Sequence, residues 1–589
     1  MIKYLVTTAL EETWPEEGEN ILFLGEWCKL FNRKEKISKY HSHVLPYHWN
    51  DREKLKKDYD SILFLYEKNL SILTEKLNEI HHVNFNLRYW RILIGPWLGY
   101  FMQVVFDRWF MLNKTIDNNS NLVNLHIPTE CNHRYIPNDM SEFIKFSHDD
   151  FWNNYLMQSI VQKKFNEKLK IINLQKPFHR KHSPIKPNSR KFKLKRIVHC
   201  LVKLNNYLFS CNNNIFLIST YLPSLKVIQL QFKFRQWPQI NKISDILNSS
   251  FCKEKRSWSL SLNIDYNSRF AEYESLLESL IPANIPLLYL EGYKSNRENV
   301  LKSSWSKNPK SIFTSNSYWS SDYFKLWGAE KVINGTSLFI GQHGGNFGMT
   351  PFSFHEAHQQ EIADKWLSWG WKSDKSSKII PIGNFKELNR TPKHNPRGYL
   401  LKVDMSIPRY SGHIMSMPMG GQYLNYLDDQ FEFVELLGSR LQSELKVKLG
   451  PVDFGWCSDL RWNQKFQNVS VVKKDSMLKL VKGCRVYIST YNATTYLESF
   501  TWNIPTIIFW NPDHWELDTI AQEYFEKLKE VSIFHSTPQS AASHLKTIWE
   551  DVDGWWFSGE VQSIVSEFCD NYSQITPNTE TNLASALLS

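Results

Sequence analysis

A polar turn between two apolar runs near the C-terminal end carries the densest set of groups that could bind a phosphate. Residues 485–488 predict a strand, 493–502 a helix and 506–509 the next strand. Backbone N–H groups at a helix N-terminus bind phosphate or diphosphate. At or just before the N-terminus of the predicted helix 493–502 stand five hydroxyl or amide side chains: Ser489, Thr490, Asn492, Thr494 and Thr495. The alternative is that Ser489 and Asn492 only cap the helix.

Glu498 lies one turn after Thr494 on the same predicted helix. Residues four apart share a helix face, so the carboxylate can face the same ligand. It could accept hydrogen bonds from a ribose diol there. The turn and the helix together predict a nucleotide site.

A glycine-rich loop, GQHGGNFG at 341–348, follows the predicted strand 337–340. Its glycines allow the backbone to approach a ligand closely. His343 is expected at the carboxyl end of the strand, where its imidazole could act as a general base or donate to a phosphate oxygen. A purely structural turn is the alternative. The downstream spacing of His355, Glu356, His358 and Glu361 does not match a zinc motif, and we expect no metal.

A third set of candidates lies near the N-terminus. Glu26 follows the predicted strand 20–24 and is the second candidate for a catalytic base. Tyr47, His48 and Trp49 could stack on and hydrogen-bond to an acceptor sugar. The alternative is a structural loop with a buried tryptophan.

Alternating strands and helices must position these residues. In the first half, strands are predicted at 3–8, 20–24, 214–219, 285–290, 311–314 and 337–340, and the pattern from 51 to about 170 is mostly helical. In the second half, strands are predicted at 398–403, 469–472, 485–489 and 505–509, and a helix at 428–449. Alternation of this kind indicates parallel α/β sheets, which bind ligands at the carboxyl ends of their strands.

The predicted fold class is therefore α/β, with two facing Rossmann-like, doubly wound parallel-sheet domains. The N-terminal acceptor-side domain is expected at 1–390, with a large helical insertion at about 51–200. The C-terminal donor-binding domain is expected at 391–570, after a polar linker near 372–396, and a flexible tail at 571–589. A ligand would lie in the cleft between the two domains.

Composition narrows the class of protein. The chain has 589 residues, 42% of them hydrophobic and 22% charged, which excludes a mainly disordered or coiled-coil protein. Its net charge of +10 suits an anionic ligand or an anionic membrane face, and no nucleic acid is implied. Eight cysteines without a CxxC pair indicate reduced thiols. The N-terminal run lacks a signal-peptide pattern, so a cytoplasmic protein is expected.

Two segments bear on membranes. The apolar run 92–106 is interrupted by Gly95-Pro96 and is shorter than a membrane span, so it predicts a buried helix, with an interfacial element as the minor alternative. Residues 176–196 are strongly basic, with three prolines and no acid. They form either a solvated loop or a patch that docks on anionic lipid or a charged acceptor.

Three well-known motifs are missing from the sequence. It contains no GxxxxGK[ST] and no complete GxGxxG at the start of either half, which disfavours a P-loop hydrolase and a dinucleotide dehydrogenase. It contains no GxSxG nucleophile elbow either.

The two-domain layout, with a phosphate-binding turn and a TxxE helix in the second half, resembles inverting GT-B glycosyltransferases. The segments FLGEWC, PYHWNDR, YWRILIGPWL, GQHGGNFG and STYNATTYLESFTWNIPTIIFW are similar to a family of transferases encoded in bacterial surface-polysaccharide and O-antigen loci. The resemblance covers nearly the whole chain. It implies an acceptor in the first half and a nucleotide-activated donor in the second, without a metal or other cofactor.

The same resemblance assigns roles to residues. Ser489, Thr490, Asn492, Thr494 and Thr495 would hold the donor phosphates, and Glu498 would hold the ribose. The His-Gly loop of polymer-forming transferases would map to His343-Gly344. The long helical segment of the first half departs from the pattern and leaves the acceptor site less defined than the donor site.

The leading hypothesis is a glycosyltransferase that moves a sugar, with inversion, from a nucleotide-activated donor to a surface-glycan or lipid-linked acceptor. Peripheral contact with the inner face of the membrane would accompany this role. One alternative is a transferase of phosphoglycerol or phosphosugar groups with a CDP-linked donor. The other is a non-catalytic nucleotide- or glycan-binding protein of a polysaccharide assembly complex.

Overall fold

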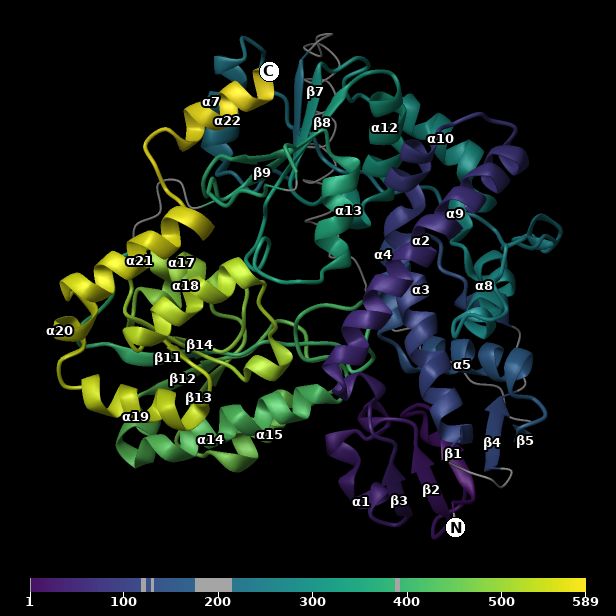
Figure 1. Ribbon diagram of the computed structural model, residues 1–589, viewed down its shortest axis with the longest axis horizontal. Helices are drawn as coiled ribbons and strands as arrows, with labels where there is room; N and C mark the ends of the chain where they lie inside the picture. The colour runs from purple at the N-terminus through teal and green to yellow at the C-terminus, as the bar shows by residue number, and fades with distance from the viewer. Residues whose placement is uncertain (1, 118–122, 129–131, 175–213, 375, 387–391) are drawn as a thin grey trace, which may run out of the picture.

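The computed structural model describes residues 2–117, 123–128, 132–174, 214–374, 376–386 and 392–589. Within these ranges the chain forms three parallel β-sheets with helices around them (Figure 1). The basic stretch 176–196 lies outside the described residues. The α/β class with parallel sheets is confirmed.

The first sheet contains strands from the N-terminal part of the chain. Its order is β3-β2-β1-β4-β5, all parallel, from β1 (Tyr4–Val6), β2 (Asn20–Phe23), β3 (His41–Val44), β4 (Val123–Pro128) and β5 (Leu169–Leu174). Its helices are α1 (Lys34–Ile37), α2 (Arg52–His81), α3 (Leu87–Asp117), α4 (Met140–Ser147) and α5 (Asp150–Lys164).

The second sheet is formed by strands between residues 215 and 381. Its order is β10-β9-β8-β7-β6, from β6 (Ile215–Ile218), β7 (Ser311–Thr314), β8 (Ser337–Gly341), β9 (Lys365–Ser368) and β10 (Ile379–Pro381). The helices in this part of the chain are α7 (Ser224–Lys233), α8 (Ala271–Asn284), α9 (Leu287–Leu290), α10 (Tyr293–Leu301), α11 (Ser317–Ser320), α12 (Asp322–Ile333) and α13 (Phe354–Ile362), of which α8 packs on α3 and α5.

The third sheet has the order β13-β12-β11-β14-β15-β16, which reverses between β11 and β14. Its strands are β11 (Tyr399–Val403), β12 (Leu445–Lys448), β13 (Ser470–Val472), β14 (Cys484–Ser489), β15 (Thr506–Phe509) and β16 (Phe534–His535). Helices α14 (Gln422–Ser443), α15 (Ser458–Lys465), α16 (Met477–Val481), α17 (Thr494–Thr501), α18 (Thr519–Glu530), α19 (Pro538–Ile548), α20 (Val552–Trp556) and α21 (Gly559–Tyr572) surround it. An open α/β sheet binds ligands at such a reversal.

The predicted N-terminal domain holds two sheets instead of one. Strands β4 and β5 fall inside the predicted helical insertion, yet they pair beside β1 and complete the first sheet. The long helices α2 and α3 run between the first and second sheets (Figure 1). The apolar run 92–106 lies in α3, whose central residues are buried against α2, α12 and α13, as predicted for a buried helix.

Two predicted elements are wrong. The run 285–290 was expected to be a strand, but it links α8 to the short helix α9, with Pro286 preceding the first helical residue. A short apolar run does not distinguish a strand from a buried helix. The expected helix 428–449 ends at Ser443, and Leu445–Lys448 is strand β12.

The predicted flexible tail is also wrong. Its first residues belong to α21, and α22 (Thr579–Leu588) returns to the second sheet and packs on β7. Leu583 and Leu587 are buried, and Glu580 forms ion pairs with Lys226 and Lys233 of α7. Burial of two leucines outweighs the polar composition of the segment.

No helix in the described ranges is both long enough and apolar enough to cross a membrane.

We expect Leu587→Ala to lower the free energy of unfolding by about 2–5 kcal/mol, because it opens a cavity against β7. Leu588 is 47% exposed, so Leu588→Ala serves as the matched control and should change the free energy of unfolding by less than about 0.5 kcal/mol. Urea denaturation measures both. Equal stability of the two variants would contradict the docking of α22.

Candidate functional site

The glycine-rich loop and the polar turn contact each other directly. The backbone N–H of Gly345 donates to Thr494 Oγ1 at 3.0 Å, although 149 residues separate them. A Cβ on Gly345 would lie 2.4 Å from the carbonyl carbon of Ala493, so only glycine permits this approach. The carboxyl ends of β8 and β14 therefore meet where the second and third sheets face each other.

Helix α17 begins without a side-chain cap. Ala493 is its N-cap residue, and no side chain in the described ranges accepts a hydrogen bond from the first turn. The alternative that Ser489 and Asn492 serve only as caps is therefore wrong. Free N–H groups in the first turn remain available for an anion.

The predicted phosphate ligands divide into two groups. Ser489 and Thr490 are fully buried, and their hydroxyls donate to Tyr491 O and Val403 O, so they shape the turn. Thr494 and Thr495 are partly exposed at the start of the helix. Thr494 Oγ1 accepts from the Gly345 N–H and Thr495 Oγ1 donates to the Tyr491 hydroxyl at 3.3 Å, so these two differ from the first group by their greater exposure.

Asn492 is buried like the first group, but its side-chain amide is only partly hydrogen-bonded. Its Oδ1 accepts a hydrogen bond from Tyr496 at 2.9 Å, while its Nδ2 has no partner in the part of the chain that the structure describes. The residue is 2% exposed. A buried amide donor without a partner is costly and marks a place for a ligand or a water molecule.

Glu498 is paired with a lysine that the sequence analysis did not select. Lys386, on the loop after β10, forms an ion pair with the buried Glu498 carboxylate. The segment around it was interpreted as a linker because it is polar and rich in turn residues. The pair brings a cation beside the first turns of α17.

His343 lies on the same loop as Gly344 and Gly345. Burial lowers the pKa of its imidazole to about 4, and the charge of Lys386 acts in the same direction. Its Nδ1 is buried and has no hydrogen-bond partner among the atoms described. At neutral pH the ring is therefore uncharged and can accept a proton.

A cavity of about 220 Å³ is lined by Trp319 and by residues of the segment after β11. The His343 ring lies 5.6 Å from that of His355, His355 lies 4.2 Å from Trp319, and Trp319 lies 6.2 Å from His413 in the cavity wall. The wall is mostly apolar and includes Tyr100, Ile407, Pro408, Met415, Met417 and Met419. The row of rings connects the cavity to His343.

Glu356 is a second titratable group beside the glycine-rich loop. Its Oε1 accepts a hydrogen bond from the backbone N–H of Gly348 at 3.1 Å. Burial raises the pKa of this carboxyl to about 8, although the Gly348 bond opposes the shift. The side chain is therefore mostly protonated at pH 7.

Glu26 is not brought together with His343. It forms an ion pair with Lys29 at 3.2 Å and lies against Gly421. No contact within the described ranges links it to the glycine-rich loop or to α17.

Tyr47, His48 and Trp49 are buried rather than displayed to a ligand. His48 Nε2 and Asp107 are 3.0 Å apart, and Trp49 Nε1 donates to Asp58 at 3.0 Å. The alternative of a structural loop with a buried tryptophan describes their placement.

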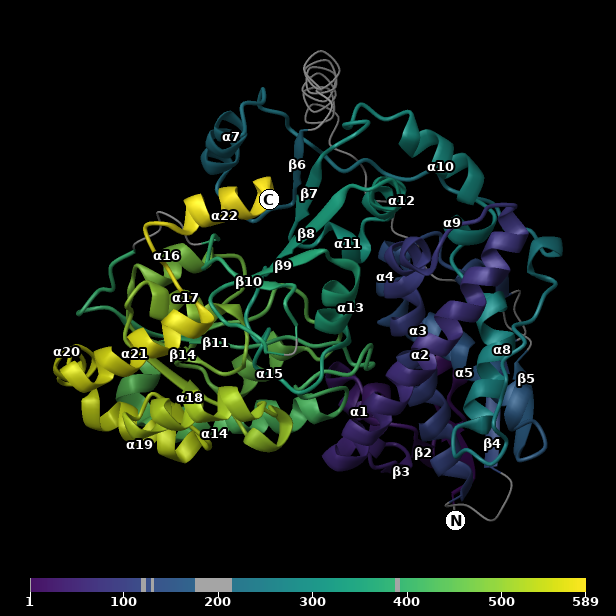
Figure 2. The ribbon, with the colours of Figure 1, turned by 45° about the horizontal axis from the view of Figure 1, so that its top comes forward.

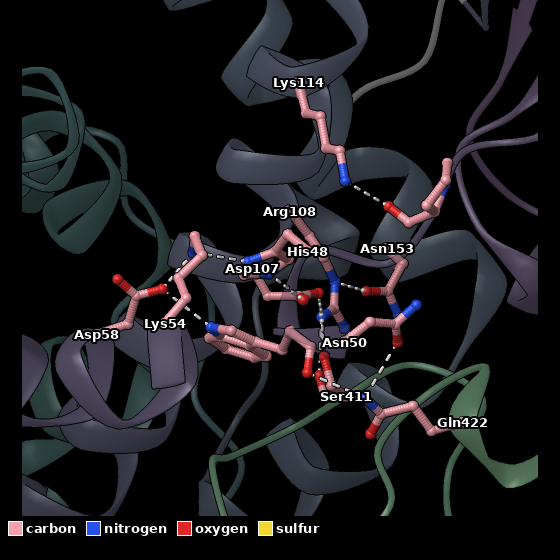
Figure 3. A network of polar contacts seen from close by, with 12 residues as sticks. His48, Asn50, Lys54, Asp58, Asp107, Arg108, Lys114, Asn153, Ser411 and Gln422 are labelled. Carbon is pink, nitrogen blue, oxygen red and sulfur yellow. Dashed lines mark hydrogen bonds and ion pairs between the residues drawn. The ribbon is translucent and has the colours of Figure 1, made fainter. Parts of the chain in front are cut away.

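Figure 3 shows the polar network around His48. Arg108 pairs with Asp107 and donates to the Ser411 carbonyl at 2.8 Å and to Asn153 Oδ1 at 3.0 Å. Burial opposes ionisation of Asp107, but the Arg108 charge and the His48 contact lower its pKa to about 2. The network joins α3 and α5 to the segment after β11.

A family model described as LIC12162 family transferase matches residues 3–587. The chain belongs to this transferase family. No curated protein matches the sequence.

Several solved structures are similar to parts of the transferase. MurG of Acinetobacter baumannii has 10% identity over 64% of this chain and 99% of its own, with a TM-score of 0.32. The wall teichoic acid polymerase TagF has 11% identity over 68% and 98%, with a TM-score of 0.32. A UDP-forming trehalose-phosphate synthase from Burkholderia xenovorans has 9% identity over 64% and 99%, with a TM-score of 0.31.

We expect the free energy of unfolding of the transferase to fall as the pH drops from about 6.5 to 4, and His48 to contribute to the slope. Burial lowers its pKa to about 4. The unfolded chain, with a pKa of about 6.5, then binds more protons in this window, which costs the folded state up to about 3 kcal/mol at pH 4.

The measurement is urea denaturation at several pH values for the wild type and His48→Gln, in which the slope should become flatter. His43 is exposed on β3, so His43→Gln is the matched control and should leave the slope unchanged. A wild-type slope in His48→Gln would contradict the contribution of His48.

Proposed function

We propose that this transferase moves a sugar from a nucleotide-activated donor to an acceptor hydroxyl. The observation that carries the proposal is the contact between Gly345 and Thr494. It places an uncapped helix N-terminus and an uncharged histidine on adjoining segments. Glycosyl transfer needs an anion site for the leaving nucleotide and a base for the acceptor hydroxyl, and both must reach the same sugar.

In this proposal the donor phosphates bind at the first turn of α17. Its free N–H groups and the Thr494 and Thr495 hydroxyls contact the phosphate oxygens. Lys386 supplies positive charge beside them, and the free amide of Asn492 donates to the same ligand or to its water. These groups stabilise the charge that develops on the leaving diphosphate, so the proposed reaction needs no metal.

His343 is the proposed general base. Its neutral imidazole takes the proton from the acceptor hydroxyl as the acceptor oxygen attacks the anomeric carbon. The bond from that carbon to the phosphate oxygen breaks, its electrons leave with the nucleotide, and attack from the opposite face inverts the configuration.

Nucleotide binding tests the donor site. Thermal shift with CMP, CDP, UDP, GDP, dTDP and ADP should give one clear hit, since a ligand at 100 times its dissociation constant stabilises by about 2.7 kcal/mol. Thr494→Val should abolish the shift. Thr547 is exposed on α19 and away from α17 in sequence, so Thr547→Val should retain it. A screen without any hit would contradict the proposed donor site.

His343→Ala should lower kcat/KM by about 10²–10⁴-fold, with an unchanged circular dichroism spectrum. The base must be deprotonated, so the acid limb of the wild-type pH profile should lie near the His343 pKa of about 4. If Glu356 were the base, the limb would lie near pH 8. Near-wild-type turnover of His343→Ala, or a limb near pH 8, would remove His343 from this role.

Analysis of the product separates sugar transfer from transfer of a phosphosugar. A simple glycoside contains no phosphorus from the donor, whereas a phosphodiester does. Donor labelled with ³²P in its sugar-linked phosphate should leave the label in the released nucleotide. Label in the acceptor product would contradict glycosyl transfer.

A further inference from the structure

Helix α7 has an apolar stripe on its exposed side. Leu225, Ile228 and Phe232 are 74%, 37% and 57% exposed. Their spacing of three and four residues places them on one face of the helix. A surface helix of a globular protein normally turns its apolar face inward. In α7 the buried residues are Leu230 and Gln231, on another side.

The neighbouring helix α22 does not use this stripe. Glu580 of α22 pairs with Lys226 and Lys233, at 2.6 Å and 2.7 Å. Both lysines lie on a different face of α7 from the stripe, since they stand one residue after Leu225 and Phe232. Figure 2 shows α7 and α22 together at the periphery of the second sheet. The ion pairs therefore hold α7 in place while its apolar stripe faces outward.

The charge near α7 in the chain identifies the chemistry of a partner. Arg235 and Lys242 follow the helix and are exposed. An apolar helix face accompanied by basic residues is the pattern of helices that lie in the interface of an anionic bilayer.

The segment that leads into α7 touches the candidate site. The Tyr221 ring stacks on that of His343 with centroids 5.9 Å apart, and its hydroxyl accepts a hydrogen bond from Asn316 at 2.9 Å. Ser219 and Tyr221 have φ values of 47° and 59°, which L-residues rarely adopt. Such backbone strain is characteristic of functional segments. Helix α7 begins three residues after Tyr221.

We propose that α7 docks on an anionic lipid bilayer, with Leu225, Ile228 and Phe232 inserted at the boundary between headgroups and acyl chains. The transferase then takes an acceptor anchored in that bilayer, whose hydroxyl reaches His343 past Tyr221. The choice of acceptor rests on the proposed glycosyl transfer, whereas the docking of α7 does not. A bilayer with anionic headgroups suits this stripe better than a protein partner, because the exposed Arg235 and Lys242 follow it in the chain.

Flotation of the full chain with vesicles tests the docking. The wild type should float with vesicles of phosphatidylglycerol and phosphatidylcholine, and at least ten-fold less with phosphatidylcholine alone. The triple variant Leu225→Ser, Ile228→Ser, Phe232→Ser should lose at least ten-fold of the binding. A triple variant at Phe64, Ile520 and Leu460, which are 72%, 60% and 37% exposed on other helices, is the matched control and should bind like the wild type.

Two results would overturn the docking of α7. One is a wild type that does not float with anionic vesicles. If light scattering then shows a dimer that the α7 variant loses, a second copy of the chain covers the stripe instead of a bilayer. The other is equal flotation of the wild type and the α7 variant.

A third arm separates the acceptor from the docking. The α7 variant should keep the nucleotide-induced thermal shift and the donor hydrolysis of the wild type, and lose at least ten-fold of its transfer to a polyprenyl-phosphate-linked glycan in anionic vesicles. Equal transfer by both proteins would overturn the anchored acceptor. A wild type without any nucleotide shift would contradict the proposed function, while flotation would still decide the docking.

Discussion

The buried guanidinium of Arg108 joins helices α3 and α5 to the segment after β11, and the position of that segment depends on it. It is 1% exposed and reaches from α3 to the carbonyl of Ser411 in the segment after β11. A buried charge is stable only when it is paired and hydrogen-bonded, and Asp107 and Asn153 meet that requirement. Arg409 makes a second link of this kind to Asp150 of α5. Both links hold the segment that forms much of the cavity wall.

A steric constraint then sets the relation between the two halves of the site. Gly345 lies against the backbone of Ala493, and this proximity is what brings His343 close to the first turn of α17. Any side chain at Gly345 would separate the loop from the helix, so one glycine couples the proposed base to the proposed anion site. Lys386 adds a contact from the loop after β10, because its ion pair with Glu498 joins that loop to α17.

The sequence predicted the parts of the site that depend on local pattern. The turn at 489–495 and the loop at 341–348 each follow a buried strand, and strand ends meet ligands in parallel sheets. The sequence did not indicate Lys386, because its partner Glu498 lies 112 residues away in the chain. Tyr47, His48 and Trp49 have the residue types of a sugar site, yet aromatic and polar residues that pair inside a core have the same composition. The first sheet was not separated from the second because strand pairing is a non-local property.

Burial shifts the pKa values of His343 and Glu356 in opposite directions. It lowers the pKa of His343 to about 4 and raises that of Glu356 to about 8, because a low-dielectric environment disfavours the charged form of each. At pH 7 the imidazole is therefore unprotonated while the carboxyl still holds its proton. Pairs of groups whose pKa values are pushed apart are the means by which a site keeps an acid and a base at one pH. The same exclusion of water that creates this pair would also strengthen the proposed hydrogen bonds from α17 to a donor phosphate.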